Sequence, residues 1–242
     1  MSKAYLLLEN GMVFEGEGFG AAGTRVGELV FTTGMTGCAE SLTDPSYRGQ
    51  LITFTFPMLG NYGICYEDRE SPHIHARGVV VREYCPSPSN FRAEVDVDTF
   101  LREEGVCGIC GVDTRRITQL IRTKGVMNAA VTDAEPDDAL LELVRANRVT
   151  GVVDEVTVKE PLLLAPRGEA RYSVALLDYG YKRSIADCLT ARGCAVTLYP
   201  ARTPAEQIIA AGHDGVMLSN GPGDPQENAY SIEQIKILMD TL

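Results

Sequence analysis

The chain has 242 residues, 45% of them hydrophobic and 23% charged, a mixture typical of a folded protein with one large or two modest domains. Its formal net charge of -11 argues against nucleic-acid and anionic-membrane partners, because such a surface repels phosphate groups. No window of about 18 apolar residues is present, so no membrane span is predicted. Seven cysteines, an odd number, and an N-terminal apolar run too short for a signal peptide indicate reduced thiols in the cytoplasm.

The first part of the chain is predicted to be mainly β-structure. Apolar runs bounded by turn residues predict strands at 4–8, 11–16, 26–32, 51–56 and 75–82. Asn10-Gly11 joins the first two as a hairpin turn, and Asp44-Pro45-Ser46-Tyr47 has the residue types of a type I turn. Helical spacing predicts helices at 97–104, 113–124 and 135–147, the last with Pro136 in its first turn. The basic stretch 115–124 is interpreted as the polar face of the second helix.

A change in pattern marks a domain boundary. The stretch 156–171 contains Pro161 and Pro166 and has no hydrophobic period, so it is predicted to be a linker between domains at 1–155 and 172–242. The second domain alternates apolar strands with helices, which indicates a parallel sheet covered on both faces. Its strands are expected at 174–178, 195–199 and 215–218, and its helices at 182–192, 204–211 and 229–242. Ligands of such sheets bind beyond the carboxyl ends of the strands, which points to 178–180 and 219–225.

Two short motifs are interpreted as structural. The segment 18–23 has the Gly-x-Gly-x-x-Gly spelling of a dinucleotide fingerprint, but a strand pattern follows it instead of the required helix. Cys107-Gly108-Ile109-Cys110 has the spacing of half a zinc site, and only the unsupported addition of His73 and His75 would complete it. We therefore expect a turn at the first motif, buried strand cysteines at the second, and no metal site.

The loop 219–225, Ser-Asn-Gly-Pro-Gly-Asp-Pro, carries the strongest functional signal. Glycines let a ligand approach bare backbone N–H groups, and prolines fix the rest of the trace, so a rigid loop at a strand end suits an oxyanion or a substrate carbonyl. A plain elaborate turn is the alternative. A nucleophile is harder to find, because Cys188 falls inside a predicted helix, Cys194 opens a strand, and His213 is expected to be solvated on a loop.

At this loop the chain resembles class I glutamine amidotransferases, and the segment 174–183 is similar to one member family, the small subunit of carbamoyl-phosphate synthetase. The N-terminal part resembles the same family independently and in the same order. The segments that carry this N-terminal resemblance are 35–37, 42–47, 60–63, 89–92 and 111–115. The resemblance implies an α/β fold overall, with a β-rich mixed α/β N-terminal domain followed by the first strands of the parallel-sheet amidotransferase domain.

The resemblance also implies a function. The family's small subunit hydrolyses glutamine and passes ammonia to a large subunit, which uses ATP, Mg²⁺ and bicarbonate to make carbamoyl phosphate for arginine and pyrimidine synthesis. The implied glutamine contacts are Ser46, Gly221 and Gly223, with the amide around Gly221 helping to hold the oxyanion. No cofactor is implied on this chain itself. Cys38-Ala39 departs from the family's usual bulkier aromatic and polar pair, which affects local packing only.

A second departure concerns catalysis. The family's nucleophile elbow, Gly-x-Cys-x-Gly, and its catalytic His and Glu are expected to lie beyond Leu242, so we expect an incomplete domain of three strands and no glutaminase activity from residues 1–242 alone. Three readings stay open: a fragment of the small subunit, a non-catalytic subunit that binds glutamine or a partner, or an N-terminal module that docks on the large subunit.

Overall fold

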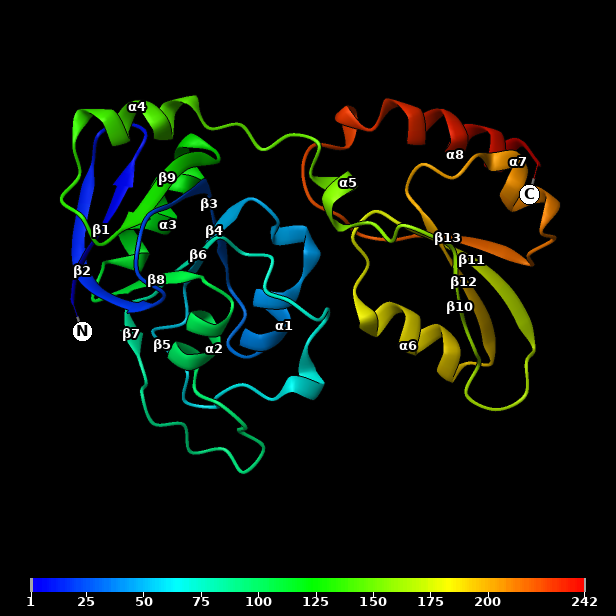
Figure 1. The fold of residues 1–242 in the computed structure, drawn as a ribbon, viewed down its shortest axis with the longest axis horizontal. Coiled ribbons are helices and arrows are strands. Elements are labelled where there is room, and N and C mark those ends of the chain that lie inside the picture. Colours follow the sequence, from blue (N-terminus) through cyan, green and yellow to red (C-terminus); the bar gives the residue numbers. More distant parts are fainter. Residues whose placement is uncertain (1, 242) are drawn as a thin grey trace. The chain divides into compact units, whose positions relative to one another are not determined.

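The computed structural model describes residues 2–241, and its contacts divide the chain into two units, 1–149 and 150–242 (Figure 1). This division falls six residues before the boundary at 155 expected from the sequence, because helix α5 (Val152–Val156) packs with the second unit. Within the described residues, no helix is both long enough and apolar enough to cross a membrane.

The first unit is built on a closed barrel with the strand order β1-β2-β8-β6-β4-β3-β9 (Figure 1). The pairs β3–β4, β4–β6 and β6–β8 are parallel and the other four are antiparallel. The barrel strands are β1 (Ser2–Leu8), β2 (Val13–Gly20), β3 (Arg25–Thr32), β4 (Gln50–Phe54), β6 (Gly78–Val80), β8 (Cys107–Cys110) and β9 (Met127–Thr132). Closure leaves no unpaired edge in this sheet.

Side-chain alternation separates the barrel's interior from its outer faces. Leu6 and Leu8 pack in one buried cluster with residues of β3, β4, β8 and β9, whereas Leu7 points the other way and packs on helix α4. The same alternation places Leu51 inside and Ile52 in the cluster beneath α1 and α2. This period of two follows from strand geometry and accounts for the continuous burial of β1.

The helices of the first unit cover the barrel, and three of them begin at an aspartate whose side chain accepts a hydrogen bond from the first turn. Helix α4 was predicted to begin at 135, but it begins at 138 because Asp137, and not Pro136, forms the cap on Leu140. On α3 the basic side chains are exposed, as expected for its polar face. The helices are α1 (Cys38–Thr43), α2 (Val97–Glu103), α3 (Thr114–Lys124) and α4 (Asp138–Ala146).

Several predictions for the first unit need correction. The strand expected at 75–82 is limited to Gly78–Val80, and strands β5 (Met58–Leu59), β7 (Glu83–Tyr84) and β9 and helix α1 were missed. The segment 18–23 is the end of β2 followed by a bend, so it opens no helix, as expected from the strand pattern after it. The hairpin at Asn10-Gly11 is confirmed by the pairing of β1 with β2.

The second unit is a four-stranded sheet with the order β10-β12-β11-β13 (Figure 1). Strand β11 pairs in parallel with both β12 and β13, as predicted. Helix α6 packs on one face around Leu176, Val196 and Leu198, and helices α7 and α8 pack on the other around Leu177 and Tyr199, so both faces are covered. The elements are β10 (Leu162–Leu164), β11 (Tyr172–Asp178), α6 (Arg183–Ala191), β12 (Cys194–Pro200), α7 (Ala205–Ala210), β13 (Gly215–Leu218) and α8 (Ala229–Thr241).

The expectation of three strands was wrong because β10 adds a fourth, antiparallel to β12, inside the stretch 156–171 that was predicted to be a linker. Its leucines are mostly exposed, and two prolines flank it. The strand is held by backbone pairing with the edge of β12 and not by burial of one face. A hydrophobic period, which is the usual sequence signal of a strand, is therefore absent there.

Two glycines of β2 make a matched test of barrel packing. A Cβ on Gly16 would lie 2.2 Å from the carbonyl oxygen of Cys110, whereas one on Gly18 would meet Ala4 Cβ at 3.3 Å. We predict that Gly16→Ala lowers the free energy of unfolding by about 1–3 kcal/mol and Gly18→Ala by less, because the first overpacks against the backbone. Urea unfolding followed by circular dichroism measures both; equal effects would contradict the barrel register.

Candidate functional site

The loop 219–225 begins where β13 ends, and it is tied to the end of the neighbouring strand β11. Ser219 extends the parallel ladder by donating its N–H to Leu177 O at 3.1 Å. The Ser219 hydroxyl accepts from Tyr179 N at 2.9 Å and donates to Asn220 O at 2.6 Å, and Asn220 Nδ2 donates to Gly180 O at 3.0 Å. Three of these hydrogen bonds therefore fix the first two residues of the loop at the carboxyl end of the sheet, and the fourth lies within the loop.

The two glycines of the loop are required for different physical reasons. A Cβ on Gly221 would lie 2.2 Å from Tyr179 O, so only glycine fits against that backbone. Gly223 has φ 78°, in the left-handed region, and its Cβ would lie 2.9 Å from Val152 Cγ2. Both glycines are exposed, and neither backbone amide has a protein acceptor within residues 2–241. The loop thus presents two N–H donors from a rigid backbone.

Asp178, the last residue of β11, is the electrostatic centre of this end of the sheet. It is 1% exposed, and its carboxylate accepts hydrogen bonds from Gly180 N, Tyr181 N and Val158 N, each at 2.8 Å. A buried carboxylate is stable only when its oxygens are satisfied in this way. The sequence pointed to 178–180 as a ligand position, but the structure engages both carboxylate oxygens with backbone amides, so Asp178 organises the loop.

Sequence reasoning missed Thr157, which joins three segments at the same place. Its hydroxyl donates to Asp178 O at 2.6 Å and accepts from Ala201 N at 2.9 Å. The segment after α5 is thereby attached to the ends of both β11 and β12. A threonine in an aperiodic stretch gave no signal of this role, because its partners lie 21 and 44 residues along the chain.

Tyr179 and Tyr181 frame this turn with phenol groups that stay neutral. Burial raises the pKa of both side chains above the ordinary tyrosine value. Nearby, Arg202 makes a two-point ion pair with Asp154, with both N–O distances at 2.7 Å, and this guanidinium lowers the pKa of Asp154. Arg202 and Asp154 border a hollow of about 230 Å³ that Pro222 of the loop also lines.

In the first unit, Ser46 lies in the turn 44–47 between α1 and β4. Residues Pro45–Tyr47 form a single 3₁₀ turn, and the Asp44 side chain caps it by accepting from Ser46 N at 2.9 Å. Asp44 is buried and Ser46 is half-buried. The predicted roles of Pro45 and Asp44 in shaping the turn are confirmed. Ser46 belongs to the first unit, and Gly221 and Gly223 share one loop of the second.

The cysteines do not assemble a nucleophilic site within the described residues. Cys107 and Cys110 are buried in β8, and burial raises the pKa of Cys107 to about 11, so these thiols are inert as expected. Cys188 is exposed on α6, and Cys194 is buried where β12 begins. None of the seven cysteines forms a disulfide, and residues 2–241 contain no group of three or more metal-ligating side chains.

His213 was expected to be solvated, and this was wrong. The ring is half-buried, with Nδ1 2.8 Å from Ser173 Oγ and Nε2 2.9 Å from Tyr199 Oη. Burial lowers its pKa below the ordinary histidine value. His213 therefore fixes the segment before β13 to the sheet and does not contact a cysteine.

Comparison with known proteins gives first a class and then a family. Residues 175–241 match the family model of class-I glutamine amidotransferases, and residues 6–131 match that of the carbamoyl-phosphate synthase small chain, CPSase domain. Over 98% of its length the chain is 43% identical to the carbamoyl phosphate synthase small chain of Syntrophotalea carbinolica, 46% to that of Listeria innocua and 45% to that of Listeria monocytogenes. The chain belongs to the carbamoyl phosphate synthase small chain family.

The chain spans about two thirds of these relatives, namely 67%, 65% and 65% of their respective lengths. Among solved structures, an aminopeptidase from Aneurinibacillus sp. strain AM-1 aligns with 99% of this chain and 52% of its own, at 12% identity and a TM-score of 0.33. A likeness this weak carries no argument about fold or function.

Replacing the buried carboxylate tests the role of Asp178. In Asp178→Asn an amide N–H₂ would face either Val158 N or the amides of Gly180 and Tyr181, so donors would oppose donors. We predict a loss of about 2–4 kcal/mol in unfolding free energy. The exposed cap Asp224, which accepts from Gln226 N at 2.9 Å, is the control, and Asp224→Asn should cost less than about 1 kcal/mol. Equal losses in urea unfolding would refute the assignment.

Proposed function

We propose that this chain is the glutamine-binding part of a carbamoyl phosphate synthase small chain, whose whole protein hydrolyses glutamine and supplies ammonia to a large chain. The observation that carries the proposal is the pair of exposed residues Gly221 and Gly223, whose backbone amides have no protein acceptor among residues 2–241. They lie at the carboxyl end of a parallel sheet, inside the segment that matches class-I glutamine amidotransferases. Both the position and the donor chemistry suit a substrate carbonyl.

The proposed glutamine contacts are Ser46, Gly221 and Gly223. In amide hydrolysis by a thiolate, negative charge develops on the carbonyl oxygen as the carbon becomes tetrahedral. A backbone N–H at Gly221, held in place by the packing of that residue on Tyr179, would stabilise this oxyanion without reorganisation. The Ser46 hydroxyl, presented by a capped turn, would supply a polar contact to the bound substrate.

No cysteine of this chain is assigned as the attacking thiolate. Cys188 and Cys194 are the cysteines of the second unit, one on a helix surface and the other buried at a strand start, and His213 is engaged by Ser173 and Tyr199. A thiolate nucleophile needs an adjacent base or a lowered pKa. We therefore propose that residues 1–242 bind glutamine and release no ammonia by themselves.

The wider reaction follows from the family. The proposed large-chain partner would carry ATP and Mg²⁺ and form carbamoyl phosphate, as a heterodimer serving arginine and pyrimidine biosynthesis. A cytoplasmic location is part of the proposal, supported by seven cysteines of which none forms a disulfide, as a reducing compartment favours.

Calorimetric titration of the 242-residue chain with L-glutamine tests the proposal. Wild type should bind glutamine without ammonia release, and Gly221→Ala should weaken binding at least tenfold because a Cβ there displaces the loop from Tyr179. Gly215→Ala is the matched control, since a Cβ on Gly215 would meet nothing within 4 Å, and it should bind like wild type. Absence of glutamine binding by wild type, or thiol-dependent ammonia release by it, would overturn the respective half of the proposal.

The partner proposal is supported by large apolar side chains exposed on the first unit. Phe91 is 96% exposed, Met35 71% and Tyr62 54%. Met35, Tyr62 and the two neighbours of Phe91 line one hollow of about 260 Å³. Aromatic and methionine side chains gathered in this way on a surface are typical of protein–protein interfaces.

Substituting Phe91 tests whether this surface binds the large chain. We predict that Phe91→Ala weakens binding to purified large chain about tenfold, because truncating an aromatic anchor costs roughly 1–2 kcal/mol or more. Leu143→Ala is the control, since Leu143 is 56% exposed on α4 of the same unit and does not line the hollow. Surface plasmon resonance with both variants measures the effect, and an unchanged affinity for Phe91→Ala would rule this surface out.

A further inference from the structure

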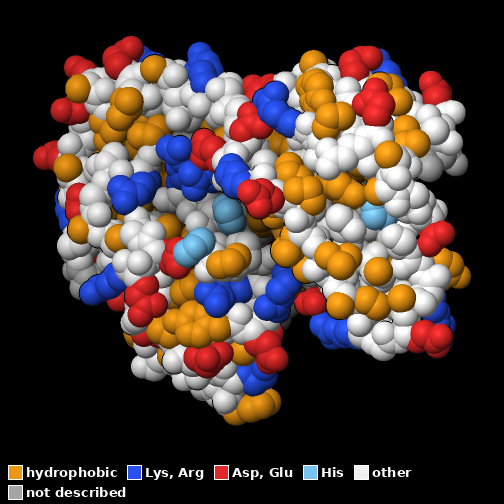
Figure 2. All heavy atoms as spheres, turned by 45° about the vertical axis from the view of Figure 1, so that its right-hand side comes forward, with side chains coloured by type: hydrophobic (Ala, Val, Ile, Leu, Met, Phe, Trp, Pro, Cys, Tyr) orange, Lys and Arg blue, Asp and Glu red, His pale blue; other side chains and the backbone are white. Residues whose placement is uncertain are grey.

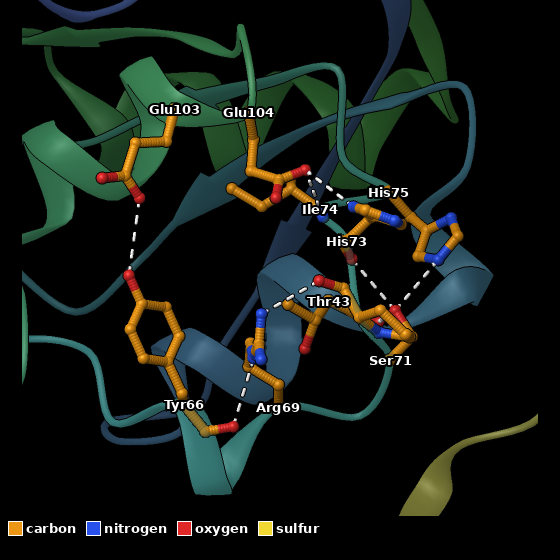
Figure 3. Close-up of polar contacts among 10 residues, drawn as sticks. Thr43, Tyr66, Arg69, Ser71, His73, Ile74, His75, Glu103 and Glu104 are labelled. Atoms are coloured by element: carbon orange, nitrogen blue, oxygen red, sulfur yellow. Dashed lines mark hydrogen bonds and ion pairs between the residues drawn. The ribbon is translucent and has the colours of Figure 1, made fainter.

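A hydrogen-bonded cluster at the end of α1 lies directly before the turn that carries Ser46 (Figure 3). Its centre is the Ser71 hydroxyl, which lies 2.7 Å from Thr43 O, 2.9 Å from His73 O and 3.0 Å from His75 Nε2. Figure 3 shows Ser71 and His75 pointing toward each other beside Thr43. The Ser71 side chain thus contacts Thr43, the last residue of α1, and also His73 and His75, which follow Ser71 in the sequence.

The number of protons in this cluster fixes the tautomer of His75. A serine hydroxyl has one proton, and both carbonyl oxygens near it can only accept. If Ser71 gave its proton to His75, its oxygen would face the Thr43 and His73 carbonyls with no hydrogen between them. His75 therefore donates from Nε2, and in the neutral ring this leaves Nδ1 without a proton. Consistently, Nδ1 is buried and has no hydrogen-bond partner in the described part of the chain.

Three further contacts of Thr43 and Leu42 show that this cluster closes α1. Thr43 is fully buried, and its hydroxyl donates to Ala39 O at 2.7 Å and accepts from Glu70 N at 2.9 Å. The backbone N–H of His75 donates to Leu42 O at 3.0 Å. The carbonyls of Leu42 and Thr43 belong to the last turn of a helix, where no intrahelical donor reaches them. The segment 70–75 supplies the missing donors.

Helix α1 depends on these outside donors. It has six residues, and its N-cap is Gly37, which has no side chain to cap the first turn. A helix this short is unstable alone, because nucleation is not repaid by enough internal hydrogen bonds. The residue that follows the helix, its C-cap Asp44, is also the N-cap of the next turn and accepts from Ser46 N. The position of Ser46 is therefore set by the end of α1, which Ser71 and His75 hold.

We propose that Ser71 and His75 are positioning residues for Ser46, holding the last turn of α1 so that the Ser46 hydroxyl is presented to glutamine. The proposal rests on the proposed function in one respect, the contact of Ser46 with glutamine. Its structural half, that Ser71 and His75 fix the backbone at Ser46, stands on the contacts above and is tested separately.

The charges around His75 favour its neutral form. Burial lowers the pKa of His75 to about 4, Arg48 and His73 act in the same direction, and Asp44 and Glu104 oppose it. Figure 2 shows Lys and Arg side chains gathered on part of the face it draws, although the whole chain carries a net charge of -11. The Nε2–H donor that the cluster requires is thus retained at neutral pH.

The structural half is tested by amide hydrogen exchange and NMR on the 242-residue chain. Ser71→Ala and His75→Leu should raise the exchange rate of the Ser46 amide about tenfold, and Ser71→Thr and His75→Gln, which keep the hydroxyl and the N–H donor, should restore protection. The control is His73→Ala, because the His73 side chain is exposed. This variant should leave the exchange rate of the Ser46 amide unchanged. Nitrogen-15 shifts should show the Nε2–H tautomer. Unchanged exchange at Ser46 in both disabling variants, or an Nδ1–H tautomer, would overturn the proposal.

The functional half is read from glutamine affinity in the same variants. Ser71→Ala and His75→Leu should raise the Kd for glutamine about tenfold at pH 7, with recovery in Ser71→Thr and His75→Gln. If the wild type binds no glutamine, the proposed function is refuted. The exchange data would still test whether Ser71 and His75 hold the backbone at Ser46. Glutamine binding that is unaffected by loosening of Ser46 would refute the positioning role and leave the proposed function standing.

The pH dependence of Tm separates a specific role of His75 from a general loosening of the fold, because general loosening does not depend on the protonation of His75. The folded-state pKa of His75 lies below its ordinary value of 6.5, so neutral His75 stabilises the fold fully above about pH 6.5 and this contribution is lost as the pH falls toward 4. The drop in Tm between pH 7 and pH 4 should therefore be smaller in His75→Gln than in wild type. An equal drop in both would contradict a neutral, half-buried His75.

Discussion

The buried carboxylate of Asp178 is the interaction on which the second unit's functional end depends. Three backbone amides from two separate segments converge on it, and together they fix Tyr179 and the turn that follows. Gly221 then packs directly on the Tyr179 carbonyl. A chain of contacts runs from a buried charge, through one turn, to the backbone donors of the loop. The donors are rigid because Tyr179, on which Gly221 packs, cannot move without breaking hydrogen bonds to the buried Asp178 carboxylate or exposing it.

The first unit uses the same principle with neutral groups. Helix α1 is too short to hold its own end, so hydrogen bonds from the segment 70–75 complete its last turn. The turn with Ser46 follows α1 directly, so a shift of the helix end would also shift Ser46. In both units the residue proposed to contact substrate is small, and its position is determined by neighbours that would not touch the substrate. Preorganisation of this kind is what transition-state stabilisation by fixed dipoles requires.

The sequence was informative wherever the signal was local. The glycines and prolines of the loop 219–225, the Asp-Pro pair before Ser46 and the alternation of strands with helices after residue 172 all reflect backbone preferences of nearby residues, and each was confirmed. The barrel strand order could not be predicted from the sequence, because pairings such as β1 with β9 join segments that are distant in the chain. Strand β10 was missed because its leucines are exposed and it is held by backbone pairing.

The supporting residues of the site could not be predicted for the same reason. Asp178 was noticed as the acid ending a strand, but its role depends on Val158, 20 residues earlier. Ser71 gave no signal, since its partner Thr43 lies 28 residues away. His213 was misjudged because a histidine on a polar loop is usually solvated, and only the fold reveals that Ser173 and Tyr199 enclose it. Local chemistry therefore pointed to the proposed donors, and long-range contacts explain why they are rigid.

The central claim is that the amides of Gly221 and Gly223 receive the substrate. Titrating nitrogen-15-labelled chain with L-glutamine, with D-glutamine as the control ligand, tests it most directly. The account predicts that the amide signals of Gly221 and Gly223 shift saturably with L-glutamine, with D-glutamine having little effect. Saturable binding of L-glutamine that leaves both glycine signals unmoved would contradict it.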